Sequence, residues 1–446
     1  MRSRTTRIII AALLACGTAH AQLRLPSLGR GLSQLGQSPL VQRVDQAVQP
    51  VVQPVLTTVL APVDLAASRL QTVTERVRAN RRELDRDPRG ELVVRAELLA
   101  QPSSPAARDA LVAAGFKPLR DDALAGLDDA LVVMKGPSGM GLADALARAR
   151  EIDPAGAYDF HHVYGSSGSV GTAVSSAPTY AGPPPAHAPG RPLQVGLIDS
   201  GVDVHHPAFS QATVHAHGCT DGDHPAPHGT AVASLMIGQA DAFHSALPQA
   251  QLYASDVYCD APTGGSVEAI ARELAWMAQM HVAVVNISLV GPANQILQRL
   301  IARAVAQGML IVAAVGNDGP AAPPLYPASW PGVVGVGAVD GKLRLLPEGA
   351  RGPQVMFVAP GSDMAAAAVG ARGFVPVRGT SFAAPLVAGL LAAGYQQAQP
   401  QGAVVAVDRL ASSAHALPQP APRDGIGRGL VGEALRTAPD AAGLAR

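Results

Sequence analysis

From Leu193 onward, apolar runs that suit buried strands alternate with stretches that have helical spacing. Strands and helices in alternation over roughly 200 residues predict a doubly wound α/β domain with a mainly parallel sheet, which we place at residues 193–400. Ligands of such domains bind beyond the carboxyl ends of the strands. The predicted elements are Gln194–Ile198, His228–Ile237, Gln251–Val257, Val267–Gln279, Ala283–Ser288, Gln295–Ala306, Leu310–Val315 and Val333–Val339.

A second pattern, of short alternating elements, covers residues 91–164. It predicts a small α+β domain in the order βαββαβ. The expected elements are the strand Glu91–Leu99, the helix Pro105–Ala114, the strands Phe116–Arg120 and Ala130–Lys135, the helix Leu142–Ile152 and the strand Tyr158–Tyr164. A domain of about 75 residues is only marginally stable alone.

Three other segments lack such alternation. Residues 22–90 have a helical apolar rhythm interrupted by prolines, which predicts a helical extension that covers a neighbouring domain; a helix on a membrane surface is the alternative. Residues 165–192 are rich in Gly, Ser, Ala and Pro, the composition of a flexible or extended linker. Residues 401–446 form a C-terminal tail whose composition indicates little.

Residues 1–21 have the order of a secretory signal peptide, with arginines, then the apolar run Ile8–Cys16, then Ala19-His20-Ala21. We therefore expect export to the periplasm or outside the cell, with cleavage after Ala21. The alternative is a lipoprotein with lipid on Cys16, which the bulky Leu14 disfavours. No later stretch is apolar over the about 20 residues that a membrane helix needs, so no transmembrane segment is expected.

Charge and cysteine content narrow the choice of partners and compartment. The 34 Lys and Arg residues equal the 34 Asp and Glu residues, so no basic excess favours binding to nucleic acid. Outside the predicted signal peptide, only Cys219 and Cys259 remain. In an oxidising compartment this pair favours a disulfide; two separately buried thiols are the alternative.

Three positions in the α/β domain carry the side chains that make a hydroxyl nucleophilic. Asp199 ends a predicted strand, His228 begins a predicted helix, and Ser381 follows Gly379-Thr380 in the first turn of another helix. A serine needs a base within reach, a histidine titrates near neutral pH, and a carboxylate can orient the imidazole. Each residue alone is more often a cap or a turn. Together, at separations of 29 and 153 residues, they indicate nucleophilic catalysis.

These motifs, in the order Asp, His, Ser, make residues 193–400 resemble the subtilisin-like serine peptidases. A fourth shared motif is Ala314–Pro320. The resemblance implies a serine endopeptidase that hydrolyses polypeptides through an acyl-enzyme on Ser381, with the amide of Asn317 in the oxyanion hole. No cofactor or metal is predicted, and calcium, common in the family, is left unassigned because no dense carboxylate loop is present.

The resemblance also assigns a substrate groove to the segment Ser288, Leu289, Val290 and Gly291. Val290 stands where the family often has Gly, so we expect a narrower groove. Gly316 and Gly379 fit places where a peptide passes close to the backbone. Pro385 is expected in the first turn of the helix that carries Ser381, where a missing N–H costs nothing.

Six histidines lie between residues 205 and 228, with Cys219 among them. A His-x-His sequence beside a thiol and carboxylates suits zinc, but no recognised ligand spacing is present. We therefore expect a polar surface loop rather than a metal site.

The segment 91–164 resembles the inhibitory propeptide of the family, which implies a self-processing precursor with its own propeptide as intramolecular inhibitor. We expect Tyr164 to fill the primary specificity pocket and the Tyr164-Gly165 bond to be cut. Cleavage anywhere in the linker is the alternative. Two other functions stand beside the peptidase: an inactive homologue that binds peptides, and a processing enzyme tethered through residues 22–90.

Overall fold

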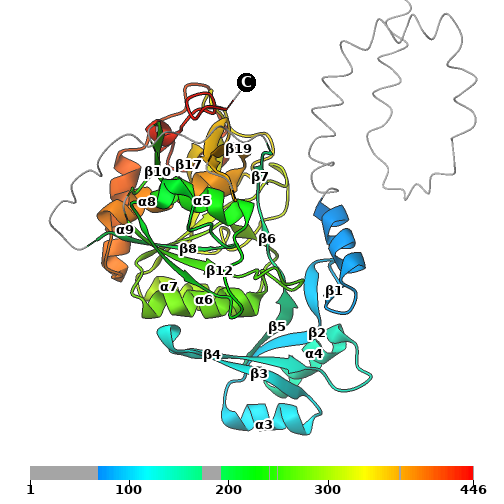
Figure 1. Ribbon diagram of the computed structural model, residues 1–446. Coiled ribbons are helices and arrows are strands. Elements are labelled where there is room, and N and C mark those ends of the chain that lie inside the picture. The colour runs from blue at the N-terminus through cyan, green and yellow to red at the C-terminus, as the bar shows by residue number, and fades with distance from the viewer. Residues whose placement is uncertain (1–68, 173–191, 241, 249, 371–372, 445–446) are drawn as a thin grey trace, which may run out of the picture. The chain divides into compact units, whose positions relative to one another are not determined.

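The computed structural model describes residues 69–172, 192–240, 242–248, 250–370 and 373–444 (Figure 1). The chain divides into residues 1–60 and residues 61–446, and all described residues belong to the second unit. The predicted signal peptide, Cys16, residues 22–68 of the extension and residues 173–191 of the linker lie outside the described residues. Among the described residues, no helix combines the length and the apolar content needed to cross a membrane.

A seven-stranded sheet forms the centre of the large domain, residues 194–444. Its order is β17-β16-β15-β13-β8-β12-β9, and all neighbouring strands are parallel. The central strands are mainly apolar because helices cover both faces of the sheet. The doubly wound α/β fold is thus confirmed. The strands are β8 (Gln194–Asp199), β9 (Thr213–His217), β12 (Gln251–Asp256), β13 (Val284–Ile287), β15 (Leu310–Ala314), β16 (Val334–Val339) and β17 (Val355–Pro360).

The edge strand β9 occupies part of the region that the sequence predicts as a polar loop, and that prediction is wrong for residues 213–217. β9 ends the sheet order beside β12, and its residues are exposed or half-buried. An edge strand needs no continuous apolar run, so His215 and His217 made this one look like a loop.

Two helices pack on each face of the sheet. On one face lie α5 (Pro227–Ile237) and α8 (Thr380–Gly394), which are buried on nearly all sides and therefore apolar all round. On the other face lie α6 (Val267–Gln279) and α7 (Gln295–Ala306). Their N-termini are capped: Ser266 accepts from the N–H of Ala269, and Asn294 accepts from the N–H of Leu297.

The C-terminal region belongs to the large domain, so the boundary expected at residue 400 falls too early. Helix α9 (Pro400–Ser412) packs against α8 through Val407. Farther on, Val431 donates its N–H to the carbonyl of Val358 in β17 and is buried in the same apolar cluster. The short elements are β10 (Gln239–Ala240), β11 (Phe243–His244), β18 (Met364–Ala367), β19 (Phe374–Arg378), η3 (Pro207–Phe209), η4 (Arg423–Gly425) and η5 (Glu433–Leu435).

The N-terminal domain, residues 84–162, is an antiparallel sheet with two helices. The central strand β2 pairs with β1 and β4 and with β5, and β3 pairs with β4. The predicted βαββαβ order is present, but β1 lies within the expected helical extension; among the described residues of that extension, 69–90, the helix covers residues 69–79. A three-residue strand leaves no apolar pattern to detect. The elements are β1 (Leu84–Arg86), β2 (Leu92–Gln101), α3 (Pro105–Ala113), β3 (Lys117–Leu124), η2 (Ala125–Leu127), β4 (Asp129–Lys135), α4 (Leu142–Ile152) and β5 (Ala157–His162).

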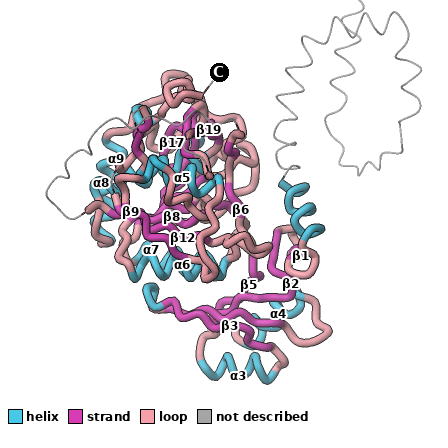
Figure 2. The backbone as a smooth tube through the Cα atoms, in the orientation of Figure 1, coloured by secondary structure: helices cyan, strands magenta, loops and turns pink. Residues whose placement is uncertain are grey.

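The sheet of the N-terminal domain packs on α6 and α7 of the large domain (Figure 2). Leu127 is buried in the same apolar cluster as residues of both helices. Gly126 approaches α6 so closely that an added Cβ would lie 2.1 Å from the carbonyl oxygen of Ala275. At the margin, Arg120 Nε donates to Glu268 Oε1 over 2.7 Å. The two domains therefore share one apolar interface with charged pairs at its edge.

Candidate active site

Asp199, His228 and Ser381 come from three elements that meet beyond the carboxyl end of β8. Asp199 is the last residue of β8, and His228 and Ser381 are the second residues of α5 and α8. Nδ1 of His228 lies 2.8 Å from Oδ1 and 3.1 Å from Oδ2 of the buried Asp199. Nε2 of His228 is buried and has no hydrogen-bond partner among the described residues. The carboxylate thus orients the ring and leaves Nε2 available to take a proton.

Close backbone contact brings α5 to this position. An added Cβ at Gly229 would lie 1.9 Å from the carbonyl oxygen of Ser200, so only glycine fits beside His228. The N–H of Gly229 donates to Ser200 Oγ over 2.9 Å, and the N–H of Ser200 donates to Asp199 Oδ1 over 2.7 Å. These two bonds fix the start of α5 to the end of β8.

Ser381 is held at the start of α8 by an exchange of hydrogen bonds with Ser288. Ser381 Oγ donates to the Ser288 carbonyl over 3.2 Å, and Ser288 Oγ donates to the Ser381 carbonyl over 2.9 Å. The second bond follows from the position of Pro385. This proline lies inside α8 and not in its first turn, so its predicted position is wrong. A proline has no N–H to give to the carbonyl four residues earlier, which is that of Ser381. Ser288 satisfies this carbonyl instead.

The side-chain amide of Asn317 is oriented toward the same place. Its Oδ1 accepts from the N–H of Thr380 over 3.0 Å, so Nδ2 points away from α8 and donates to Ser167 Oγ over 2.7 Å. Gly379 has φ +135°, and an added Cβ there would lie 2.9 Å from Asn317 Nδ2. Gly316 has φ +101°, a conformation that favours glycine. Gly379 thus leaves room for the amide of Asn317, whereas an added Cβ at Gly316 would lie 2.5 Å from Cδ1 of Leu325.

The connecting segment, residues 164–170, runs through this site (Figure 1). Its strand β6 (Gly165–Ser166) pairs antiparallel with β14 (Leu289–Val290), and its strand β7 (Ser169–Val170) pairs with β19. Between these strands, Ser167 contacts Asn317, and an added Cβ at Gly168 would lie 2.8 Å from Cε2 of Phe382. The linker predicted from residue 165 therefore begins as paired strand, with Ser167 next to Asn317 and Gly168 next to Phe382, the residue after the candidate nucleophile.

Comparisons with known proteins agree with this arrangement. The model of the family described as "Subtilase family" matches residues 190–429, more than half of the 446 residues. The chain belongs to the subtilase family. Subtilisin-like protease 1 of Trichophyton rubrum is 35% identical over 212 residues, which cover 46% of this chain and 41% of that protein. Subtilisin E of Bacillus subtilis (strain 168) is 30% identical over 217 residues, which cover 46% of this chain and 55% of that protein.

The chain thus spans about half or less of the length of these curated relatives. Among solved structures, fervidolysin from Fervidobacterium pennivorans, described as a keratinolytic enzyme related to subtilisin, superposes with a TM-score of 0.60. The sequences are 18% identical, and the match covers 78% of this chain and 61% of that one. This likeness supports the subtilase fold.

Tyr164 lies in a buried pocket of this subtilase, next to Gly291 and Pro292. Its hydroxyl donates to the carbonyl of Pro292 over 2.6 Å, its N–H donates to the carbonyl of Gly265 over 2.8 Å, and its side chain is buried. An added Cβ at Gly291 would lie 2.6 Å from Cγ of Tyr164, so glycine is needed for the ring. Tyr164 is three residues ahead of Ser167, which contacts Asn317. Tyr164 therefore lies apart from the residue that contacts Asn317, which does not favour the predicted cleavage of the Tyr164-Gly165 bond.

The helix at residues 69–79 contacts both the N-terminal domain and the residue after Asn317. Nη1 of Arg69 lies 2.9 Å from Oδ2 of Asp318, and Nη2 lies 2.9 Å from Oε2 of Glu91. Val73 of the same helix packs in a small apolar cluster with Val163. The extension thus joins the N-terminal domain to the residue that follows Asn317, a contact for which the sequence shows no signal.

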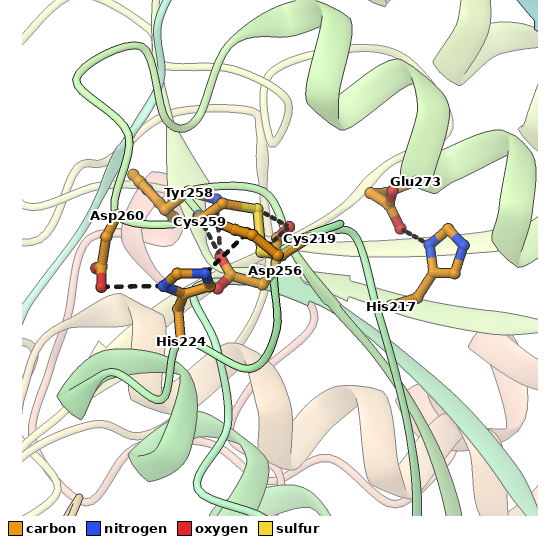
Figure 3. Close-up of a disulfide and its surroundings, with 9 residues drawn as sticks. His217, Cys219, His224, Asp256, Tyr258, Cys259, Asp260 and Glu273 are labelled. Atoms are coloured by element: carbon orange, nitrogen blue, oxygen red, sulfur yellow. Dashed lines mark hydrogen bonds and ion pairs between the residues drawn. A yellow bond between two sulfur atoms is a disulfide. The ribbon is translucent and has the colours of Figure 1, made fainter.

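Cys219 and Cys259 form a disulfide with a Cα–Cα distance of 5.5 Å (Figure 3). It joins the loop after β9 to the loop after β12. The histidines nearby have separate partners: His217 Nδ1 lies 2.7 Å from Glu273 Oε2, and His224 Nε2 lies 3.0 Å from Asp221 Oδ1. These two histidines of the region therefore each bind a different nearby carboxylate.

Two groups of described residues have ligand atoms close enough to hold a metal ion. Asp256 with the two cysteines is one, but these sulfurs are already bonded to each other. Glu97, His161 and Glu268 form the other, and Arg120 donates to both carboxylates. Burial raises the pKa of Glu97, but hydrogen bonds from His161 and Arg120 outweigh it and lower this pKa to about 2. Arg120 thus supplies the positive charge of the second group.

Proposed function

We propose that this protein is a serine endopeptidase made as a precursor, and that it cuts its own chain between Ser167 and Gly168. The observation that carries the proposal is the path of the connecting segment. Its two short strands are paired on either side of these two residues, and the amide of Asn317 binds Ser167 between them. A segment held in this way resembles a bound peptide more than a linker.

The chemistry assigns one role to each residue. Ser381 Oγ leaves the Ser288 carbonyl, gives its proton to His228 Nε2 and attacks the carbonyl carbon of Ser167. The charge that develops on the carbonyl oxygen is stabilised by Nδ2 of Asn317 and by the backbone N–H of Ser381 at the positive end of α8. The proton on His228 then passes to the nitrogen of Gly168 as the C–N bond breaks. Water hydrolyses the Ser381 ester and restores the hydroxyl.

After cleavage, residues up to Ser167 remain as an inhibitor in the groove. The tail keeps the antiparallel pairing of β6 with β14 and the buried ring of Tyr164. The N-terminal domain keeps its apolar contact with α6 and α7. Activity toward other polypeptides therefore follows removal of the N-terminal domain, which is small enough to be only marginally stable once released.

We further propose that the protein is exported with loss of residues 1–21. The arginine-rich and apolar start of the sequence supports export, and the disulfide between Cys219 and Cys259 suits an oxidising compartment. Attachment through lipid on Cys16 is the competing route, and labelling with a radioactive fatty acid distinguishes the two.

The test is N-terminal sequencing of full-length protein that carries Ser381→Ala, with Ser412→Ala on the exposed end of α9 as the control. The control and the parent should yield a fragment that begins at Gly168, and Ser381→Ala should stay joined across residues 167 and 168. A fragment beginning at Gly168 in purified Ser381→Ala would remove Ser381 from the role of nucleophile. An uncut parent that no fluorophosphonate probe labels would instead favour the inactive peptide-binding homologue.

A further inference from the structure

We propose that Tyr258 is a peptide-binding residue that clamps the backbone of an extended substrate. Counted back from the cleaved bond with Ser167 as the first residue, it binds the second residue, Ser166, and the fourth, Tyr164. The inference rests on the proposed function, because the connecting segment stands in for the substrate. The contacts that support the inference lie on the edge of the connecting segment opposite to the edge that pairs with β14.

On that edge the backbone pairing stops early. Val163 forms an antiparallel bridge with Ser266, and the N–H of Tyr164 donates to the carbonyl of Gly265. Beyond this point the loop 258–265 turns away from the segment. The N–H of Gly265 donates to the carbonyl of Val257, and that of Gly264 to the carbonyl of Ala261. These loop amides are therefore used within the loop and are not presented to the peptide.

The phenol of Tyr258 fills the place of the missing pairing. In an extended chain, the carbonyl of one residue and the N–H two residues later point to the same edge. Tyr258 Oη donates to the Tyr164 carbonyl over 3.4 Å, and it accepts from the backbone N–H of Ser166. A phenol hydroxyl is one donor and an acceptor, like one peptide group of a neighbouring strand. Because only backbone groups are bound, the clamp suits an extended peptide of any sequence.

The ring of Tyr258 packs closely against Gly265. Burial raises the pKa of Tyr258, so the hydroxyl keeps the proton that it donates. An added Cβ at Gly265 would lie 3.1 Å from Cε1 of Tyr258 and 2.3 Å from the Tyr164 carbonyl oxygen. Only glycine leaves room at this position for both the ring and the peptide.

The turn that carries Tyr258 is braced by Asp256 and the disulfide (Figure 3). Asp256 Oδ1 accepts from the N–H of Tyr258 over 2.7 Å and from the N–H of Cys259 over 3.1 Å. Cys259, with φ +46°, forms the disulfide with Cys219, which lies in the neighbouring loop after β9. The disulfide thus holds the residue adjacent to the clamp, which gives it a role in the groove as well as in stability.

The first test needs no catalytic activity. In full-length protein with Ser381→Ala, amide hydrogen exchange at Ser166 is followed by mass spectrometry with fragmentation. Tyr258→Phe keeps the ring and removes both hydrogen bonds, so exchange at Ser166 should become about 10-fold faster. Tyr253→Phe is the matched control, since that tyrosine lies on β12 and its hydroxyl accepts from Gln194 outside the groove. Equal exchange in Tyr258→Phe and the parent overturns the clamp.

The second test uses the enzyme after its own processing. We compare a peptide with four residues before the cleaved bond with an ester that has a single residue there. In Tyr258→Phe, the preference in kcat/KM for the long peptide over the ester should fall about 10-fold, mainly through KM. An unchanged preference would overturn the proposal. If the parent hydrolyses neither compound, the proposed function fails, and the exchange measurement still decides the role of Tyr258.

Discussion

Self-cleavage should depend on the absence of a side chain at residue 168. Gly168 has φ +136°, and an added Cβ would lie 2.8 Å from Cε2 of Phe382 and 3.0 Å from the carbonyl oxygen of Arg378. At Gly165, three residues earlier in the same segment, an added Cβ would meet nothing within 4 Å. Gly168→Ala and Gly165→Ala therefore make the same chemical change with opposite consequences.

The size of the effect follows from the backbone conformation. An alanine held in a region of φ and ψ that is nearly reserved for glycine costs about 1 to 3 kcal/mol. The cost applies only while the segment lies in the site, so it lowers the fraction of uncut chains whose segment is held there for cleavage. With about 2 kcal/mol and 1.4 kcal/mol per factor of ten, Gly168→Ala should be cut roughly 30-fold more slowly than the parent. Contact with Phe382 adds to this value, and Gly165→Ala should stay within about 2-fold of the parent.

The assay is a pulse-chase measurement of the uncut chain in newly made protein, with Ser381→Ala as the uncut reference. The new N-terminus of each product is read by mass spectrometry. If Gly168→Ala is cut at the parental rate and at the same bond, the connecting segment does not enter the site as the structure indicates. Equal slowing of both glycine variants would point to a general loss of folding and would also refute the reasoning.

Two further predictions concern stability. Replacing both Cys219 and Cys259 with serine opens a loop with a sequence separation of 40 and should lower the free energy of unfolding by about 4 kcal/mol. Urea titration of the Ser381→Ala protein measures this change, and an unchanged midpoint would contradict it. The lowered pKa of Glu97, about 2 against about 4.3 in an unfolded chain, contributes stability that is present above pH 4 and is lost as the pH falls toward 2. Glu97→Gln should remove this part of the acid sensitivity, and circular dichroism between pH 5 and pH 2 checks whether the acid transition becomes less steep.

Much of the fold could be read from the sequence because its main elements are buried. Strands covered on both faces must be apolar along their length, so β8, β13 and β15 stand out as short apolar runs. The helices α6 and α7 begin and end at the predicted residues because they carry a clear apolar face and polar caps. Elements without such a face, β1 and β9, escaped detection.

In the candidate site, too, some features could be predicted from the sequence and others could not. Asp199, His228, Ser381 and Asn317 lie in motifs whose order along the chain is visible, and the structure brings them to one place. The bond between Ser288 and the Ser381 carbonyl could not be foreseen, because it depends on Pro385 lying inside α8 and on β13 passing beside that helix. Such a contact joins residues 93 positions apart.

The sequence by itself determined which residue types are available for chemistry and which segments are buried, since both follow from local composition and spacing. Only the tertiary structure decided which residues of the connecting segment lie next to Asn317. Because the predicted strand ends in Tyr164, the sequence suggested that this aromatic side chain fills the primary specificity pocket. The sequence is, however, compatible with any register of the segment along the groove. The docking of the N-terminal domain on α6 and α7 fixes where the segment begins, and the pairing of residues 165–166 with β14 fixes its register. Ser167 and Gly168 therefore lie at the site for a geometric reason that no local pattern encodes.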